Sequence, residues 1–212
     1  WSAHSSAAIA AATPTAIGPM ELVLSQFFDK CLLRLLCHGF RPGKLSPRND
    51  FWHSDISFGE VPPALSMLYS IEGTEGLADT MFANMYAAYD ELSDVMKEFL
   101  GSLKAEHNAE DLVKEVPSRV KVTEVPPGVI HPVVRTHPGS GRKALFVNPY
   151  YTSHFIGMTP EESRPILEYL YDRATRHEKI YRHSWRVGDV LMWDNRCTMH
   201  RGRWHDPTEV RD

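Results

Sequence analysis

Positions 52–58 read Trp-His-Ser-Asp-Ile-Ser-Phe and contain a histidine and an aspartate separated by one residue. Alternate side chains of a β-strand point to the same face, so His53 and Asp55 can contact one metal ion if this segment is a strand. A His-x-Asp tripeptide is also a common coincidence. The tripeptide alone does not identify a metal site; further candidate ligands are needed from the rest of the chain.

A second segment, at positions 193–200, reads Trp-Asp-Asn-Arg-Cys-Thr-Met-His and supplies His200. Together the two segments offer two imidazoles and one carboxylate, the set that holds non-haem Fe(II) and leaves coordination positions open. A ligand distant in sequence is expected when a metal lies between strands that the fold brings together. The alternative is that His200 is an ordinary loop histidine.

Composition describes an ordinary globular chain of 212 residues, 42% hydrophobic and 24% charged, which predicts a single domain. The formal net charge of −4 gives no sign of a nucleic-acid or membrane surface, and no apolar run reaches the roughly 18 residues of a membrane span. Three widely spaced cysteines favour a reducing compartment, so we expect a cytoplasmic protein. We interpret Cys197 as a packing residue, because a thiolate ligand would favour zinc.

The first half of the chain alternates loops, strands and helices. We expect a poorly ordered lead-in over 1–20, followed by a single domain over 21–212. The expected elements are a helix over 21–37, a loop over 38–50, strands over 51–58, 64–72 and 79–83, a turn over 73–76, and a helix over 85–105. Residues 106–127 are polar with several prolines and predict a surface insertion or mobile lid.

The second half contains clearer local signals. Strands over 131–137 and 143–147 flank Pro-Gly-Ser-Gly, which predicts a hairpin. Thr159, Pro160 and Glu162 form a capping-box start for a helix that should run to about His177. Strands over 179–185 and 190–193 follow, joined by a turn at Gly188. Many short strands with few helices predict an antiparallel double-sheet β core with helical decoration.

From Phe51 to Arg211 the chain resembles the taurine dioxygenase / 2,4-dichlorophenoxyacetate dioxygenase family of Fe(II)- and 2-oxoglutarate-dependent oxygenases. The matching segments are 52–58, Asp79-Thr80, Ala87-Ala88-Tyr89, His131 to Pro138, Leu145 to Asn148, Gly188 to Val190, and Trp193 to Arg196 with His200-Arg201. The resemblance implies a mainly β fold with helices, built on a double-stranded β-helix (jelly-roll) core.

The resemblance also implies a site. It assigns Fe(II) to His53, Asp55 and His200, with 2-oxoglutarate as cosubstrate and O2 as co-reactant. Arg211, eleven residues beyond His200, stands where the family places the arginine that binds the far carboxylate of 2-oxoglutarate, and Thr80 stands where a hydroxyl assists it. Without the resemblance, Arg211 would be a solvated arginine and Thr80 a strand residue.

Further positions follow from the same resemblance. Trp193 and Asn195 should support the metal ligands, although for Trp193 structural packing is at least an equal alternative. Ile56 and Tyr151 correspond to positions that line the substrate pocket. For Tyr151, packing is an equal alternative. His131 and His137 belong to the motif without being ligands, so we expect each to be a structural or a surface histidine.

The implied reaction is hydroxylation of a small organic anion with release of succinate and CO2. The anion is a sulfonate such as taurine, an alkyl sulfate or an aryloxyalkanoate, and the sequence does not distinguish these three substrate classes. Homo-oligomerisation stays open.

The chain departs from the family pattern at three places. Residues 1–45 do not match, Leu77-Ala78 replace a common Gly-Gly, and the chain stops at Asp212 before a final strand. We therefore expect a jelly roll that is incomplete at both ends. Two alternatives remain open: a truncated, inactive member that keeps only a binding or vestigial domain, and, outside the family, a cupin-like isomerase or zinc hydrolase.

Overall fold

The computed structural model describes residues 8–9, 35–40, 51–70, 78–115 and 127–204. The elements, in chain order, are β1 (Ala8–Ile9), β2 (Leu35–Phe40), β3 (Leu65–Ser70), β4 (Ala78–Asn84), α2 (Met85–Asp90), α3 (Asp94–Gly101), β5 (Lys104–His107), α4 (Glu110–Glu115), β6 (Val129–Pro132), β7 (Val134–Thr136), β8 (Lys143–Leu145), β9 (Thr152–Phe155), α5 (Pro160–Ala174), the 3-10 helix η1 (His177–Lys179), β10 (Ile180–Ser184), β11 (Val190–Asp194) and β12 (Thr198–Trp204).

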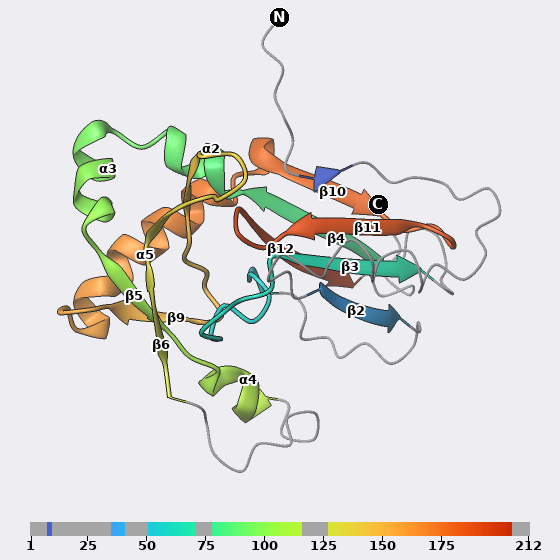
Figure 1. Ribbon diagram of the computed structural model, residues 1–212, viewed down its shortest axis with the longest axis horizontal. Coiled ribbons are helices and arrows are strands. Elements are labelled where there is room, and N and C mark those ends of the chain that lie inside the picture. Colours follow the sequence, from blue (N-terminus) through green and yellow to red (C-terminus); the bar gives the residue numbers. More distant parts are fainter. Residues whose placement is uncertain (1–7, 10–34, 41–50, 71–77, 116–126, 205–212) are drawn as a thin grey trace, which may run out of the picture.

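The described strands form several small sheets, in the orders β1-β11-β3-β2, β10-β4-β12, β6-β5-β9 and β7-β8. Their pairings are antiparallel except for β2 with β3, which is parallel. In Figure 1 the first two sheets lie on the right and the helices α3 and α5 on the left. The expected mainly β architecture is therefore present as several small sheets with helical decoration.

The main core lies between the helices and the strands that face them. Fully buried side chains come from β4, α2, α3, β9, α5 and β12, and they include Ala83, Met85, Leu100, Phe155, Leu170 and Met199. A smaller cluster of Phe82, Leu191 and Trp193 joins β4 to β11. The strand β4 contributes Ala83 to the main cluster and Phe82 to the smaller one, so the strand that pairs with β12 and its His200 is packed on both faces.

Several local predictions are confirmed. The strand β3 falls within its expected range, and β4 extends one residue beyond its expected range at each end. The strands β7 and β8 form the expected hairpin, with Gly141 at a φ of 69° in its turn. The strand expected over 131–137 is divided between β6 and β7, which belong to different sheets. The helix α5 begins with the capping box between Thr159 and Glu162 and with Pro160 in its first turn. It ends at Ala174, slightly before the expected His177, which begins the separate 3-10 helix.

The predicted strand over 51–58 is wrong. Only His53 pairs, in an isolated antiparallel bridge with His200, and the chain then turns. The Ser57 N–H donates to the Ser54 carbonyl (3.3 Å), and Ile56 adopts a φ of 48°, which a β-branched residue rarely takes. The alternation of apolar and polar residues came from a turn whose serines, Ser54 and Ser57, are buried.

The predicted helix over 85–105 is two helices followed by a strand. Ser93 caps a new helix by accepting a hydrogen bond from the Met96 N–H, and that helix ends at Gly101. Ala105 lies in β5 at the centre of a sheet and is completely buried. The predicted insertion over 106–127 therefore begins inside a strand, continues through α4, and between 116 and 126 lies outside the described residues.

At the start of the chain the prediction is tested only in part. Residues 35–37 of the expected helix and 38–40 of the expected loop form β2, which satisfies backbone groups along one edge of β3. Ala8 and Ile9, within the expected lead-in, pair with β11. The rest of the expected helix and lead-in, and the expected turn over 73–76, lie outside the described residues.

The two closing strands are confirmed as β10 and β11, but they belong to different sheets. The turn between them contains Gly188 at a φ of 90°, which glycine adopts without steric cost. Within the described part of the chain, the helices are too short or too polar to cross a lipid bilayer.

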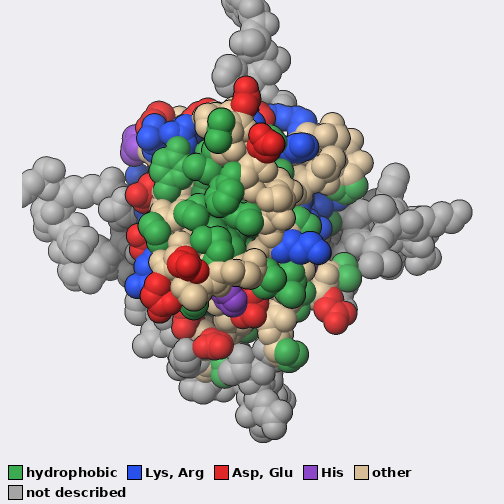
Figure 2. Space-filling view, turned by 90° about the vertical axis from the view of Figure 1, so that its left-hand side faces the viewer, with side chains coloured by type: hydrophobic (Ala, Val, Ile, Leu, Met, Phe, Trp, Pro, Cys, Tyr) green, Lys and Arg blue, Asp and Glu red, His purple; other side chains and the backbone are tan. Residues whose placement is uncertain are grey.

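Figure 2 shows the face that lies on the left in Figure 1, where hydrophobic side chains gather around a central area. The helices on that side carry exposed apolar residues, among them Val95 and Phe99 of α3 and Tyr169 of α5. Apolar surface of this kind is common where proteins associate.

Candidate metal centre

His53 and His200 are brought together by their backbones. Each N–H donates to the carbonyl of the other residue, at 2.9 Å from His53 and 2.8 Å from His200. In an antiparallel bridge, directly opposed side chains lie on the same face, and the two imidazole centroids are 4.3 Å apart. The two distant histidines of the sequence are thus direct neighbours.

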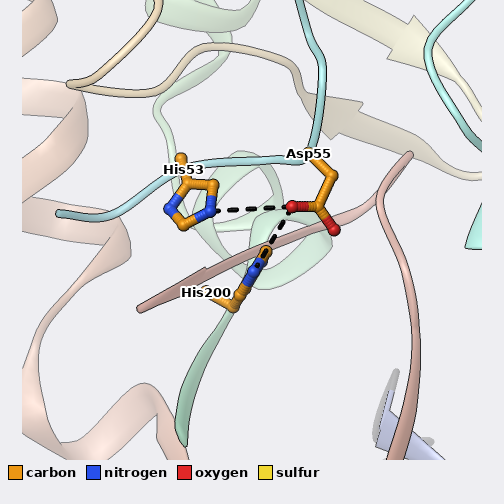
Figure 3. Close-up of side chains that lie close together, drawn as sticks. All are labelled: His53, Asp55 and His200. Atoms are coloured by element: carbon orange, nitrogen blue, oxygen red, sulfur yellow. Dashed lines mark ion pairs between the residues drawn. The ribbon is translucent and has the colours of Figure 1, made fainter. Parts of the chain in front are cut away.

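Asp55 reaches the same point from the turn that follows His53. Its Oδ1 lies 3.6 Å from Nε2 of His53 and 3.6 Å from Nε2 of His200, as Figure 3 shows. These separations exceed the length of a hydrogen bond. Donors held about 2.1 Å from one ion lie about 3 to 4 Å apart, so the observed spacing suits a shared cation.

The ring orientation of His53 favours metal binding through Nε2. Its Nδ1 lies 2.8 Å from the Phe51 carbonyl, which can only accept, so Nδ1 carries the proton. In the neutral imidazole the lone pair is then on Nε2, which faces Asp55. A backbone carbonyl that fixes the tautomer in this way is a usual support for a histidine ligand.

His200 is positioned mainly by packing. Its ring lies against Trp193 (centroids 4.6 Å apart) and Phe82 (6.0 Å), and its Nδ1 has no hydrogen-bond partner within the described part of the chain. Burial lowers the pKa of His200 to about 3, against the opposing effect of Asp55. The imidazole is therefore neutral at ordinary pH and keeps a lone pair for a metal.

Asp55 is ionised in this setting. Burial raises its pKa, but the imidazoles of His200 and His53 and the hydroxyl of Ser66 outweigh that effect and hold the pKa well below its usual range. The Ser66 hydroxyl donates to Oδ2, while the Asp55 N–H donates to Oδ1 of Asn195 (3.3 Å). Sequence reasoning identified Asn195 as a supporting residue but missed Ser66, whose only signal was a serine within an apolar strand.

A second cluster, of His137, Asp194 and Cys197, also has metal-like proximity but is occupied by internal bonds. Nδ1 of His137 accepts two backbone N–H bonds in the hairpin turn, and Nε2 donates to Asp194 (2.9 Å). Burial raises the pKa of Cys197 to about 12, so its thiol stays protonated. The expected packing role of Cys197 and structural role of His137 agree with these contacts.

Thr80 lies on the same face of its sheet as His200. In the β4–β12 register His200 pairs with Phe82, and Gly202 pairs with Thr80. Paired residues share a face of the sheet, as do residues two apart on one strand, so the side chains of Thr80 and His200 point to the same side. Oγ1 of Thr80 accepts a hydrogen bond from Nε1 of Trp185 (2.9 Å), which leaves its own hydrogen for another acceptor. Arg211, the expected partner of Thr80, lies outside the described residues.

Tyr151 belongs to an aromatic cluster beside His53. Its ring centroid lies 4.9 Å from Phe58, 4.7 Å from Tyr150 and 6.1 Å from His53, and Tyr150 stacks on Phe51 at 5.3 Å. Burial raises the pKa of Tyr151, so its hydroxyl stays protonated. The other expected pocket residue, Ile56, is half-buried at the turn next to Asp55.

Asn148 connects this aromatic cluster to the turn that carries Asp55. It is 1% exposed; its Nδ2 donates to Oγ of Ser57 (2.9 Å), and its Oδ1 accepts from the Tyr151 N–H (2.9 Å). Ser57 also contacts Nδ1 of the buried His107 (3.1 Å).

His131 hydrogen-bonds the Gly59 carbonyl (3.0 Å), which gives it the structural role that was expected.

Comparison with known proteins places the chain in a family. The model of the family described as "Taurine catabolism dioxygenase TauD, TfdA family" matches residues 38–212. The chain is 42% identical over 167 residues to an alpha-ketoglutarate-dependent 2,4-dichlorophenoxyacetate dioxygenase of Burkholderia sp. (strain RASC), covering 77% of this chain and 56% of that relative. It is 34% identical over 168 residues to an alpha-ketoglutarate-dependent sulfate ester dioxygenase of Pseudomonas putida, covering 74% of this chain and 56% of the relative.

Among solved structures, the chain is similar to AAD-2 in complex with Mn(II) and N-oxalylglycine, with a TM-score of 0.67 and 36% identity over 77% of this chain and 66% of that one. The chain spans a little over half the length of the two dioxygenases above. Its family model nevertheless covers most of the chain, including all three candidate ligands. The chain therefore belongs to the TauD/TfdA family of alpha-ketoglutarate-dependent dioxygenases.

Proposed function

We propose that His53, Asp55 and His200 hold Fe(II) in a 2-oxoglutarate-dependent dioxygenase that hydroxylates a small organic anion and releases succinate and CO2. The observation that carries the proposal is the position of Asp55 Oδ1, 3.6 Å from Nε2 of each histidine. Two neutral imidazoles and one carboxylate suit Fe(II) and leave coordination positions for other ligands. Bound iron would supply the activation of O2 and of the 2-oxo acid.

The side chains of the protein would bind and orient the reactants. The Nε2 atoms of His53 and His200 would supply the two imidazole donors, and Asp55 supplies one negative charge. The hydroxyl of Thr80 can donate to the far carboxylate of 2-oxoglutarate, and Arg211 stands at the family spacing for a charge-assisted bond to the same group. We further propose that the sheets β1-β11-β3-β2 and β10-β4-β12 form a jelly-roll core.

The substrate class stays as broad as the sequence predicts: a sulfonate, an alkyl sulfate or an aryloxyalkanoate. The aromatic cluster of Phe51, Phe58, Tyr150 and Tyr151 beside His53 favours a substrate whose anionic group is attached to an apolar or aromatic part. The names of the two relatives, a dichlorophenoxyacetate and a sulfate ester dioxygenase, support testing both kinds. A cytoplasmic location and a homo-oligomer remain part of the proposal, the latter supported by the apolar face that includes α3.

The direct test is succinate release from 2-oxoglutarate under air, with Fe(II) and ascorbate, across a panel of these three substrate classes. We expect at least one class to stimulate succinate release, and we expect His200→Ala to give none. An inactive family member would bind metal and 2-oxoglutarate without any stimulation. A folded, iron-loaded wild-type protein that never exceeds His200→Ala would contradict the proposal.

A further inference from the structure

The two carboxylate oxygens of Asp55 have different surroundings. Oδ1 faces the Nε2 atoms of His53 and His200, at 3.6 Å from each. Oδ2 accepts a hydrogen bond from the Ser66 hydroxyl on β3. One oxygen is thus directed to the candidate metal position, and the other is held by the protein.

The hydrogen bonds behind Ser66 have only one possible direction. Nε1 of Trp193 can only donate, so the atom of Asn195 that it contacts at 3.0 Å is the acceptor Oδ1. The amide nitrogen of Asn195 then faces Oγ of Ser66 (2.7 Å) and donates to it. Because the Ser66 oxygen accepts from Asn195, its own hydrogen is directed to Asp55.

This chain of donors is buried; Ser66 and Trp193 lie on the paired strands β3 and β11, and Asn195 is in the turn directly after β11. Ser66, Asn195 and Trp193 are 2%, 1% and 3% exposed, so solvent competes little for their bonds. Ser66 and Trp193 are direct partners in the β3–β11 register, and the Asn195 N–H donates to the Ala64 carbonyl (2.9 Å). The position of the Ser66 hydroxyl is therefore set by the sheet.

We propose that Ser66 is a positioning residue for the metal centre, which restricts Asp55 to a single donor oxygen. Carboxylates can bind a cation through one oxygen or two, and a hydrogen bond to the second oxygen favours the one-oxygen mode. Restricting Asp55 in this way keeps room at the metal for the 2-oxo acid and O2. The inference rests on the proposed function, because Asp55 has to be a metal ligand.

The first test compares Ser66→Ala with Ser70→Ala, a buried serine on the same strand that serves as the matched control. The readout is the dissociation constant for Mn(II), measured from the electron paramagnetic resonance signal of the free ion. We expect Ser66→Ala to weaken Mn(II) binding about 10- to 100-fold, as loss of a supporting partner of a ligand usually does. Ser70→Ala should stay within about twofold, and similar urea midpoints of the two metal-free variants would exclude general destabilisation.

A second pair keeps the test decisive if removal of the serine impairs folding. Ser66→Thr and Ser66→Val have nearly the same shape, but only threonine has a hydroxyl. We expect the threonine variant to bind Mn(II) at least about tenfold more tightly than the valine variant. Equal affinities within this pair, or a Ser66→Ala affinity equal to that of Ser70→Ala, would overturn the inference.

Failure of the proposed ligand set would look different. It would appear in proteins that keep Ser66: wild type would not bind Mn(II), or Asp55→Asn would bind it as tightly as wild type. Either result would show that Asp55 is not a metal ligand, and it would contradict both the proposed site and the role of Ser66. Loss of binding in Asp55→Asn together with full binding in Ser66→Ala would leave the site and reject the role of Ser66.

Discussion

The two candidate histidine ligands depend on different supports. His53 is oriented by a backbone carbonyl at its Nδ1, whereas His200 packs against the rings of Phe82 and Trp193. In both cases the imidazole is placed before any metal arrives, because the backbone bridge between them is part of the fold. Such pre-placement lowers the ordering cost of binding an ion.

Replacement of His200 and of His137 by alanine should have different effects on metal binding, because only His200 is a proposed ligand. His200→Ala removes one donor, so we expect loss of Fe(II) binding and of succinate formation. His137→Ala is the matched control: it removes the bond to Asp194 and should lower the free energy of unfolding by about 1–3 kcal/mol while metal binding persists. Metal titration and urea unfolding of both variants measure this. Metal bound by His200→Ala as tightly as by wild type would refute the assignment.

The cosubstrate contacts can be tested by affinity alone. Thr80→Val removes a hydroxyl with little change of shape, and Arg211→Ala removes a charged partner. We expect the Arg211 variant to raise the 2-oxoglutarate concentration needed for half-maximal turnover more than the Thr80 variant. The guanidinium brings an opposite charge and can donate two parallel bonds to the carboxylate, whereas a hydroxyl can donate only one. Both variants should keep their metal. An unchanged requirement in the arginine variant would mean that another residue binds the far carboxylate.

At the scale of elements, β5 introduces a pH-sensitive group into the interior. His107 is completely buried, and burial together with His131 lowers its pKa from 6.5 to about 3. Between about pH 3 and pH 6.5 this imidazole is protonated in the unfolded chain and neutral in the folded chain. The free energy of unfolding should therefore fall as the pH is lowered through that window, by at most about 1.4 kcal/mol per pH unit from this group.

Urea unfolding at pH 7, 6 and 5 checks this contribution. His107→Gln keeps a polar side chain but cannot take up the proton, so its stability should decline less steeply with acidification than that of wild type. The comparison is needed because burial also lowers the pKa values of His131 and His200. Parallel pH profiles for the variant and wild type would show that His107 is not responsible.

Elements with strong local signals could be predicted from the sequence. The capping box at Thr159 and the Pro-Gly-Ser-Gly turn specify their own geometry within a few residues, and α5 and the β7–β8 hairpin formed as expected. The segment 51–58 could not be predicted in the same way. Its turn, with Ile56 at a positive φ, depends on hydrogen bonds to residues near 198 that only the folded chain supplies.

The candidate site shows the same division. His53, Asp55 and His200 were predicted from residue type and family spacing, and the structure brings them together, although by a bridge and a turn instead of a strand. Ser66 was not predicted, because a serine in an apolar strand has no local mark of a partner. Its role depends on β3 lying beside β11 and on the turn that carries Asp55.

At the scale of the whole molecule, metal binding should stabilise the fold. The candidate ligands join the segment 51–58 to β12, two parts of the chain that meet only after folding. An ion present at about 100 times its dissociation constant adds about 2.7 kcal/mol to the free energy of unfolding, which is about 5–10 °C in Tm for a chain of this size. Calorimetry with Mn(II) should show this shift for wild type and none for Asp55→Asn. An equal shift in both proteins would place the ion elsewhere.

The most direct measurement is a crystal structure of the Mn(II)-soaked protein with anomalous scattering from manganese. It locates the ion without depending on activity or on the choice of substrate. We expect one strong anomalous peak within about 2.2 Å of Nε2 of His53, Oδ1 of Asp55 and Nε2 of His200. A peak at His137, Asp194 and Cys197 instead, or no peak in a crystal whose three donors are well ordered, would contradict it.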